Sequence, residues 1–131
     1  MIRTLLSMIA ILASHLYAGT IQNDSQFKAA VASMGSESKM VLMIYTTDDC
    51  PECAYMKHKV FPDKNVGAYM RQNFIVIEKN VRKDPLPKGY DFFGIPTMFF
   101  IDKEGNKKET IVGGKRSEPF LQELHRIRER E

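Results

Sequence analysis

The sequence predicts an α/β domain in which a central mixed sheet of about four strands is flanked by helices. Short apolar runs of strand length lie at residues 40–45, 74–77 and 98–101, and a fourth strand follows the last run after a turn-like segment. Apolar stripes with helical period lie before, between and after these runs. The 131 residues are enough for one hydrophobic core and contain no internal repeat.

The first 18 residues are expected to be a secretory signal peptide. They carry one early positive charge at Arg3, an apolar stretch at residues 5–12 and a small residue, Ala18, before the expected cleavage site. An uncleaved anchor is the weaker interpretation, because the apolar stretch is too short to cross a bilayer. We expect a mature domain of residues 19–131 that is not inserted in a membrane and is exported to the periplasm or another oxidising compartment.

The N-terminal half of this domain is expected to alternate helices and strands. Polar residues 23–26 can start a helix whose stripe is Phe27, Ala30, Val31 and Met34, and Gly35 ends it. The strand at 40–46 is followed by a helix to about Val60, by a helix capped by Asp63, and by the strand at 74–77. Residues 82–93 are a loop or irregular helix. Its aromatic residues Tyr90, Phe92 and Phe93 are expected to pack beneath it, the alternative being a groove for a client chain.

The C-terminal part is expected to be a hairpin and a helix. A strand at 98–101, a turn at 102–106 and a returning strand at 108–112 form the hairpin. Ser117 can cap the last helix. The apolar side chains of that helix that are expected to face inward are Phe120, Leu121, Leu124 and Ile127.

The two cysteines of the chain, Cys50 and Cys53, lie at the junction of the 40–46 strand and the next helix. Pro51 suits the first helical position, which places Cys50 at the helix N-terminus. Free N–H groups and the positive end of the helix dipole favour a thiolate there. Cys53, one turn later, is close enough to form a disulfide with it. This arrangement is typical of thiol–disulfide exchange.

Other interpretations of the cysteines are weaker. A structural zinc site needs four ligands, and His15, His58 and His125 do not supply a second ligand pair. A purely structural disulfide over so short a loop would remove little chain entropy. The methionines lie in apolar runs, where core packing explains them better than copper binding. We therefore expect no metal and no cofactor. The net charge of +3 and its short basic pairs indicate no nucleic-acid partner.

The order strand, Cys-Pro-Glu-Cys helix, strand, Gly94-Ile95-Pro96-Thr97 strand, hairpin, Gly-Gly and helix resembles the thioredoxin-like family over residues 24–130. Residues 60–76 are similar to exported members and to the C-terminal domain of membrane thiol-reductant transporters. The resemblance implies a three-layer sandwich. It also implies that Pro96 is cis and lies against the cysteines, and that the Ile95–Thr97 segment binds an extended client segment. A trans proline that simply opens a strand is the alternative.

The sequence departs from cytoplasmic thioredoxins at three places. Ile44 stands where they carry a buried aspartate, Asp49 where they carry a tryptophan, and Pro51-Glu52 where they carry Gly-Pro. Deprotonation of Cys53 must therefore use another group, such as Glu52 or water.

The expected function is an exported thiol–disulfide oxidoreductase that reduces client disulfides. Cys50 attacks, Cys53 resolves the mixed disulfide, and a membrane thiol-reductant donor re-reduces the pair. Pro51 and Glu52, which lie between the cysteines, are expected to modulate the reactivity of the pair. The negative charge of Glu52, with that of Asp48 and Asp49, is expected to raise the pKa of Cys50 and favour a reductant. The alternatives are a non-catalytic binding module and an oxidant that introduces disulfides.

Overall fold

The structure, a computed structural model, describes residues 19–131, so the expected signal peptide lies outside the described residues. A four-stranded sheet has the order β2-β1-β3-β4. The strands are β1 (Met40–Thr46), β2 (Phe74–Asn80), β3 (Thr97–Ile101) and β4 (Lys107–Val112). β1 pairs in parallel with β2 and antiparallel with β3, which pairs antiparallel with β4. The predicted mixed sheet of four strands is confirmed.

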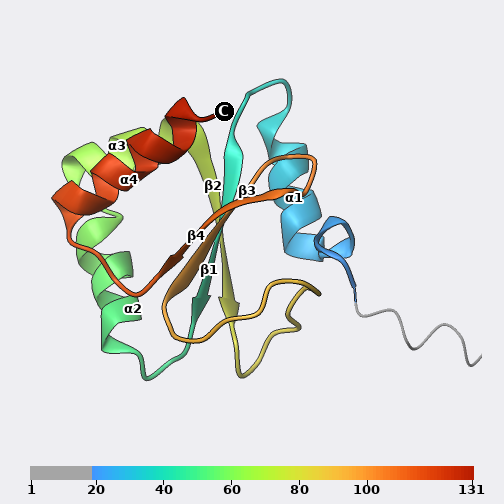
Figure 1. The fold of residues 1–131 in the computed structure, drawn as a ribbon, viewed down its shortest axis with the longest axis horizontal. Coiled ribbons are helices and arrows are strands. Elements are labelled where there is room, and N and C mark those ends of the chain that lie inside the picture. The colour runs from blue at the N-terminus through green and yellow to red at the C-terminus, as the bar shows by residue number, and fades with distance from the viewer. Residues whose placement is uncertain (1–18) are drawn as a thin grey trace, which may run out of the picture.

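The helices cover both faces of this sheet (Figure 1). α1 (Ser25–Met34), preceded by a short 3₁₀ turn, η2 (Ile21–Asn23), lies on one face. The other face carries α2 (Pro51–Tyr55), which continues into a π-helical turn, η3 (Met56–Val60), and also α3 (Lys64–Asn73) and α4 (Ser117–Glu129). Among the helices of residues 19–131, none is long and apolar enough to cross a membrane.

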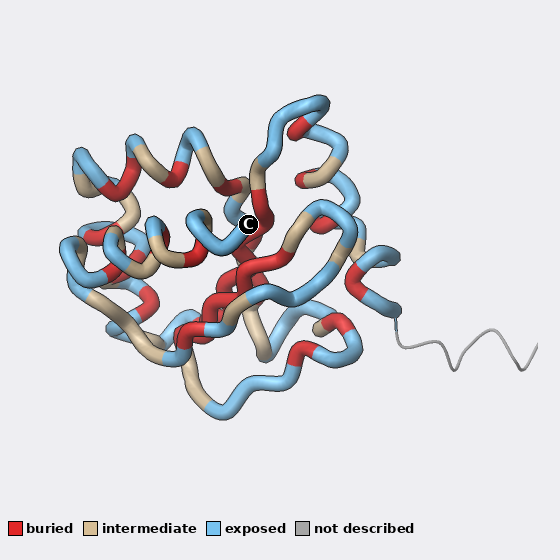
Figure 2. The backbone as a smooth tube through the Cα atoms, turned by 45° about the horizontal axis from the view of Figure 1, so that its top comes forward, coloured by how far each residue is buried: buried red, intermediate tan, exposed pale blue. Residues whose placement is uncertain are grey.

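β1 is buried along its whole length and supplies both halves of the core (Figure 2). Because side chains alternate along a strand, Leu42 and Ile44 pack with the helices α3 and α4, whereas Met43 and Tyr45 pack with α1. A strand buried on both faces reads as a continuous apolar run, as residues 40–45 do. Cys50 follows this buried strand after a loop of three residues.

Polar residues start the first and third helices as predicted. The Asp24 carboxylate accepts a hydrogen bond from the Phe27 N–H at 3.0 Å, and Asp63 accepts from Asn65 and Val66 at the start of α3. At the end of α1, Gly35 adopts a φ of 57°, which side chains with a Cβ rarely adopt. The prediction for Ser117 is wrong: it is the first residue of α4, Arg116 precedes it, and no side chain caps this helix.

The aromatic residues of the 82–93 loop do not all pack beneath it. Tyr90 is buried and its carbonyl oxygen accepts a hydrogen bond from the Tyr45 hydroxyl at 3.0 Å. Phe92 is 37% exposed, although its ring makes an edge contact with Tyr45, and Phe93 is 98% exposed. Tyr45, Tyr90 and Phe99 fill the space beneath the loop with edge-to-face contacts. The expected burial is therefore wrong for Phe93 and also for Phe92, which stays exposed beside Tyr45.

Candidate active site

Cys50 and Cys53 form a disulfide at the point where β1 ends and α2 begins, with their Cα atoms 5.2 Å apart. Cys50 is the N-cap residue, and its sulfur accepts a hydrogen bond from the Cys53 N–H at 3.1 Å. Pro51 occupies the first turn, where its missing N–H removes no helical hydrogen bond. The position predicted for all three residues is confirmed.

The two sulfurs differ in access. Cys50 is partly exposed, whereas Cys53 is only 2% exposed. An incoming sulfur atom therefore reaches Cys50 first. Cys53 is placed to attack Cys50 from within the protein.

A groove of about 420 Å³ opens beside Cys50. It brings Ile95, from the loop before β3, next to Cys50, Pro51 and Glu52, although Ile95 is over 40 residues further along the chain. The residues that line the groove are Thr47, Asp49, Cys50, Pro51, Glu52, Arg82 and Ile95. The structure thus joins the cysteine motif and the Ile95 segment in one site.

The segment after Ile95 is held in place by hydrogen bonds. The Ile95–Pro96 peptide bond is cis, and the Pro96 carbonyl oxygen accepts from the Gly113 N–H at 2.7 Å. Thr97 is buried and its hydroxyl donates to the carbonyl oxygen of Gly94. Pro96 and Thr97 therefore support the loop from inside, whereas Ile95 is partly exposed at the groove.

The two aspartates before Cys50 are paired with cations. Asp48 pairs with Lys83 and Asp49 with Arg82, the latter at 3.0 Å, so the turn after β2 is tied to the loop before the cysteines. The nearby Thr47 hydroxyl and the Arg82 guanidinium hold the pKa of Asp49 below its ordinary value. Because the charge of both carboxylates is offset, their expected opposition to a Cys50 thiolate is weakened.

Glu52 also lines the groove, and its side chain is half-exposed. Its carboxylate lies 3.7 Å from the Arg116 guanidinium, which also stacks 4.0 Å from the Tyr55 ring centroid. The carboxylate sits so close to Gly114 that a side chain there would collide with it. The Gly113-Gly114 segment therefore leaves the space that Glu52 occupies.

A model of the thioredoxin-like domain family matches residues 27–128 of this chain. The chain belongs to the thioredoxin-like family. Its sheet with helices on both faces and its Cys-x-x-Cys pair are those of a thiol–disulfide oxidoreductase of this family.

Several known proteins are similar to this thioredoxin-like chain. The thiol:disulfide interchange protein DsbD of Vibrio vulnificus is 25% identical over 114 residues, which cover 82% of this chain and 19% of the relative. The chain thus spans about a fifth of that relative's length. The reduced C-terminal domain of DsbD from Neisseria meningitidis superposes with a TM-score of 0.62 at 23% identity, covering 78% of this chain and 94% of that one. A thioredoxin from Thermus thermophilus gives 0.61 at 26% identity, covering 76% and 82%.

In this thioredoxin-like protein a second, polar hollow of about 220 Å³ lies behind the cysteines. Glu78 of β2 lies there and was not predicted from the sequence. Its Oε1 accepts hydrogen bonds from the Thr46 hydroxyl at 2.7 Å and the Lys57 ammonium at 3.1 Å. The residues that line this hollow are Thr46, Thr47, Asp48, Cys50, Cys53, Ala54, Lys57, His58 and Glu78. The feature of the sequence that could have indicated Glu78 is an acidic residue directly after the apolar run 74–77.

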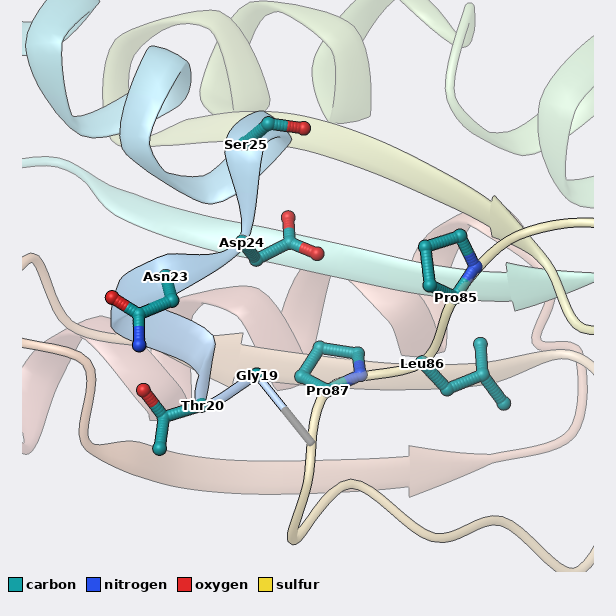
Figure 3. A pocket seen from close by; sticks show the side chains of 8 residues that line it. All are labelled: Gly19, Thr20, Asn23, Asp24, Ser25, Pro85, Leu86 and Pro87. Atoms are coloured by element: carbon teal, nitrogen blue, oxygen red, sulfur yellow. The ribbon is translucent and has the colours of Figure 1, made fainter. Parts of the chain in front are cut away.

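A further hollow, of about 270 Å³, lies where α1 begins, against residues 85–87 (Figure 3). It shares no lining residue with the two hollows beside the cysteines. The Asp24 carboxylate at its edge already pairs with the buried Lys79 at 2.7 Å. Across residues 19–131, no three histidine, cysteine or acidic side chains come together in a way that could hold a metal ion. The cysteine pair is therefore the candidate centre of chemistry.

Proposed function

We propose that this thioredoxin-like protein reduces disulfides in exported client proteins. The observation that carries the proposal is the difference in access between the sulfurs, with Cys50 at the Ile95 groove and Cys53 buried behind it. The reduced Cys50 thiolate attacks a client disulfide, forms a mixed disulfide and releases one client thiolate. Cys53 then attacks the Cys50 sulfur and releases the second. Two electrons pass to the client, and the Cys50–Cys53 disulfide remains.

The client binds along the groove as an extended segment. Ile95 lines the groove, and in this proposal its backbone pairs with such a segment as a strand would, while Pro96 and Thr97 hold the loop in position. Phe93, almost fully exposed two residues earlier, adds an apolar contact for the client side chains. This combination suits clients whose disulfide lies in a flexible or partly unfolded segment.

The proposed compartment and electron donor follow from the N-terminus and the relatives. Residues 1–18 have the charge, apolar stretch and small residue of a signal peptide. An exported reductant needs a source of electrons, and we assign this role to a membrane thiol-reductant donor. The relatives named thiol:disulfide interchange proteins support thiol–disulfide exchange as the chemistry. Glu52 supports the reducing direction, since a negative charge beside Cys50 disfavours the thiolate of the reduced form, although Arg116 at 3.7 Å offsets part of that charge.

Disulfide reduction and client trapping test the cysteine cycle. The reduced protein should reduce insulin, Cys50→Ser should abolish this activity, and Cys53→Ser should accumulate mixed disulfides with clients in the exporting cell. If Cys53 is alkylated faster than Cys50 in the reduced protein, the roles of the two cysteines are reversed. A wild-type protein without insulin reductase activity would favour the binding module.

Equilibration with glutathione tests the direction of electron flow. The potential should lie well below the roughly −120 mV of the strong oxidants of this fold. A value near −120 mV would instead make the protein a disulfide-introducing oxidant.

Phe93→Ser tests the client surface separately from the chemistry. It should raise KM for insulin while leaving reduction of the small disulfide 5,5′-dithiobis(2-nitrobenzoate) unchanged, because the small disulfide needs only Cys50. An unchanged KM for insulin would remove Phe93 from the client surface.

A further inference from the structure

The buried cysteine must lose a proton during the cycle. Cys53 attacks as a thiolate, but an ordinary cysteine has a pKa near 8.5, and burial in apolar surroundings raises it. Cys53 is 2% exposed, and Met56, three residues further along the same helix, is buried and apolar. The thiol therefore needs a route by which its proton can leave.

The polar hollow behind the cysteines offers this route. Cys53 and Glu78 both line it, and its volume of about 220 Å³ has room for water molecules that could carry a proton between them. In the parallel ladder Glu78 lies directly opposite Ile44, so β2 supplies an acid at the level where β1 is apolar.

The hydrogen bonds of Glu78 leave part of its carboxylate available. Both of them, from Thr46 and Lys57, are made to Oε1. Within residues 19–131, no hydrogen bond to Oε2 is found. The side chain is 40% exposed, so a proton received there can pass on to solvent.

The charged and titratable groups around Glu78 come from η3 and from the loop before α2. η3 contributes the Lys57 ammonium, which balances the carboxylate, and His58. The loop before α2 contributes Asp48, whose charge is already paired with Lys83, and the cysteines themselves follow it. Two carboxylates line the hollow. Asp48 is paired with the 81–84 turn, and Glu78 is the one that this turn does not hold.

We propose that Glu78 is the proton acceptor for Cys53 in the resolving step, which rests on the proposed function. Water in the hollow passes the thiol proton of Cys53 to the Glu78 carboxylate. The Cys53 thiolate attacks the Cys50 sulfur, the bond between Cys50 and the client sulfur breaks, and the client thiolate leaves with the electron pair. Glu78 then releases its proton to solvent or to the departing thiolate.

Stopped-flow reaction of the reduced protein with 5,5′-dithiobis(2-nitrobenzoate) separates the two steps. Attack by Cys50 releases the first nitrothiobenzoate, and resolution by Cys53 releases the second. Glu78→Gln should leave the first release unchanged and slow the second by about tenfold or more near pH 7, as expected on loss of a proton acceptor. The deficit should shrink as pH approaches about 8.5 and above, because hydroxide then removes the thiol proton.

Three variants separate proton transfer from a structural effect. Glu78→Asp keeps a carboxylate and should keep the wild-type pH profile of the second release. Glu37→Gln removes an exposed acid outside the hollow and should change neither release. Lys57→Gln breaks the same ion pair but keeps the carboxylate, so its pH profile should stay close to the wild type.

Two results would overturn the inference alone. One is a Glu78→Gln protein with the wild-type pH profile for the second release. The other is a Lys57→Gln protein identical to Glu78→Gln in rate and profile, which would mean that only the ion pair matters. A wild-type protein with no Cys50-dependent first release would overturn the proposed function as well.

Discussion

Lys79 is expected to be the charged side chain on which the fold depends most. Its ammonium pairs with Asp24 at 2.7 Å and donates to Gln26 at 2.8 Å, joining β2 to the start of α1. The side chains of Lys79 and Asp24 are only 3% and 10% exposed. Lys79→Met fits an apolar surrounding but leaves the Asp24 carboxylate buried without its cation.

The structure sets the size of this effect. Removal of one partner from a buried ion pair destabilises by about 3–5 kcal/mol, because the remaining charge has lost its solvation and its partner. Asp24 keeps its hydrogen bond from the Phe27 N–H, which favours the lower end. We expect a loss of about 3 kcal/mol in the free energy of unfolding, which lowers Tm by roughly 10–15 °C in a domain of this size.

Urea unfolding at pH 7 measures the effect against two controls. Lys57→Met, which breaks the half-exposed pair with Glu78, should reduce stability by no more than about 1 kcal/mol. Lys79→Met combined with Asp24→Asn removes both charges and keeps a helix cap, so it should recover much of the loss. A Lys79→Met protein no less stable than Lys57→Met would refute the reasoning that burial makes this pair important.

Three further outcomes are expected. Glu52→Gln should raise the reduction potential measured by glutathione equilibration. The rise should be less than the roughly 30 mV that corresponds to one pKa unit of the attacking thiol, because the charge removed is half-exposed. A variant with a lower potential would contradict this. Arg126 holds the pKa of Glu109 below its ordinary value, so that interaction stabilises the fold at neutral pH and is lost as pH falls through the lowered value. Glu109→Gln should therefore lower the urea midpoint at pH 7, with the difference vanishing in strong acid. Gly67→Ala should also lower the urea midpoint, although alanine normally favours a helix by about 1 kcal/mol, because its Cβ would lie 2.9 Å from the Phe61 carbonyl oxygen; a raised midpoint would show that the backbone yields.

The sequence predicts those parts of the molecule that local chemistry determines. The run 40–45 is apolar at every position because β1 is covered on both faces, and Asp24 and Asp63 start helices through hydrogen bonds within one turn. Cys50 and Pro51 place the reactive end of α2 in the same way. Each of these features needs only a few consecutive residues.

The parts that the sequence does not predict depend on which distant segments meet. Phe93 and Tyr90 belong to the same aromatic cluster in the sequence, and only the packed arrangement around Phe99 decides that one is buried and the other exposed. The pairing of Asp49 with Arg82 depends on how the turn after β2 approaches the cysteine loop. Glu78 enters the site only through the register of β1 with β2.

Two consecutive residues of β2 have opposite surroundings: Glu78 lies in the hollow with the cysteines, and Lys79 is buried near α1. Insertion or deletion of one residue before them would shift the strand by one position and exchange their faces. A deletion would bring the Lys79 ammonium into the hollow beside the redox pair, and an insertion would bury the Glu78 carboxylate near Asp24. A one-residue insertion or deletion between Phe74 and Ile77 would therefore remove stability and redox activity together.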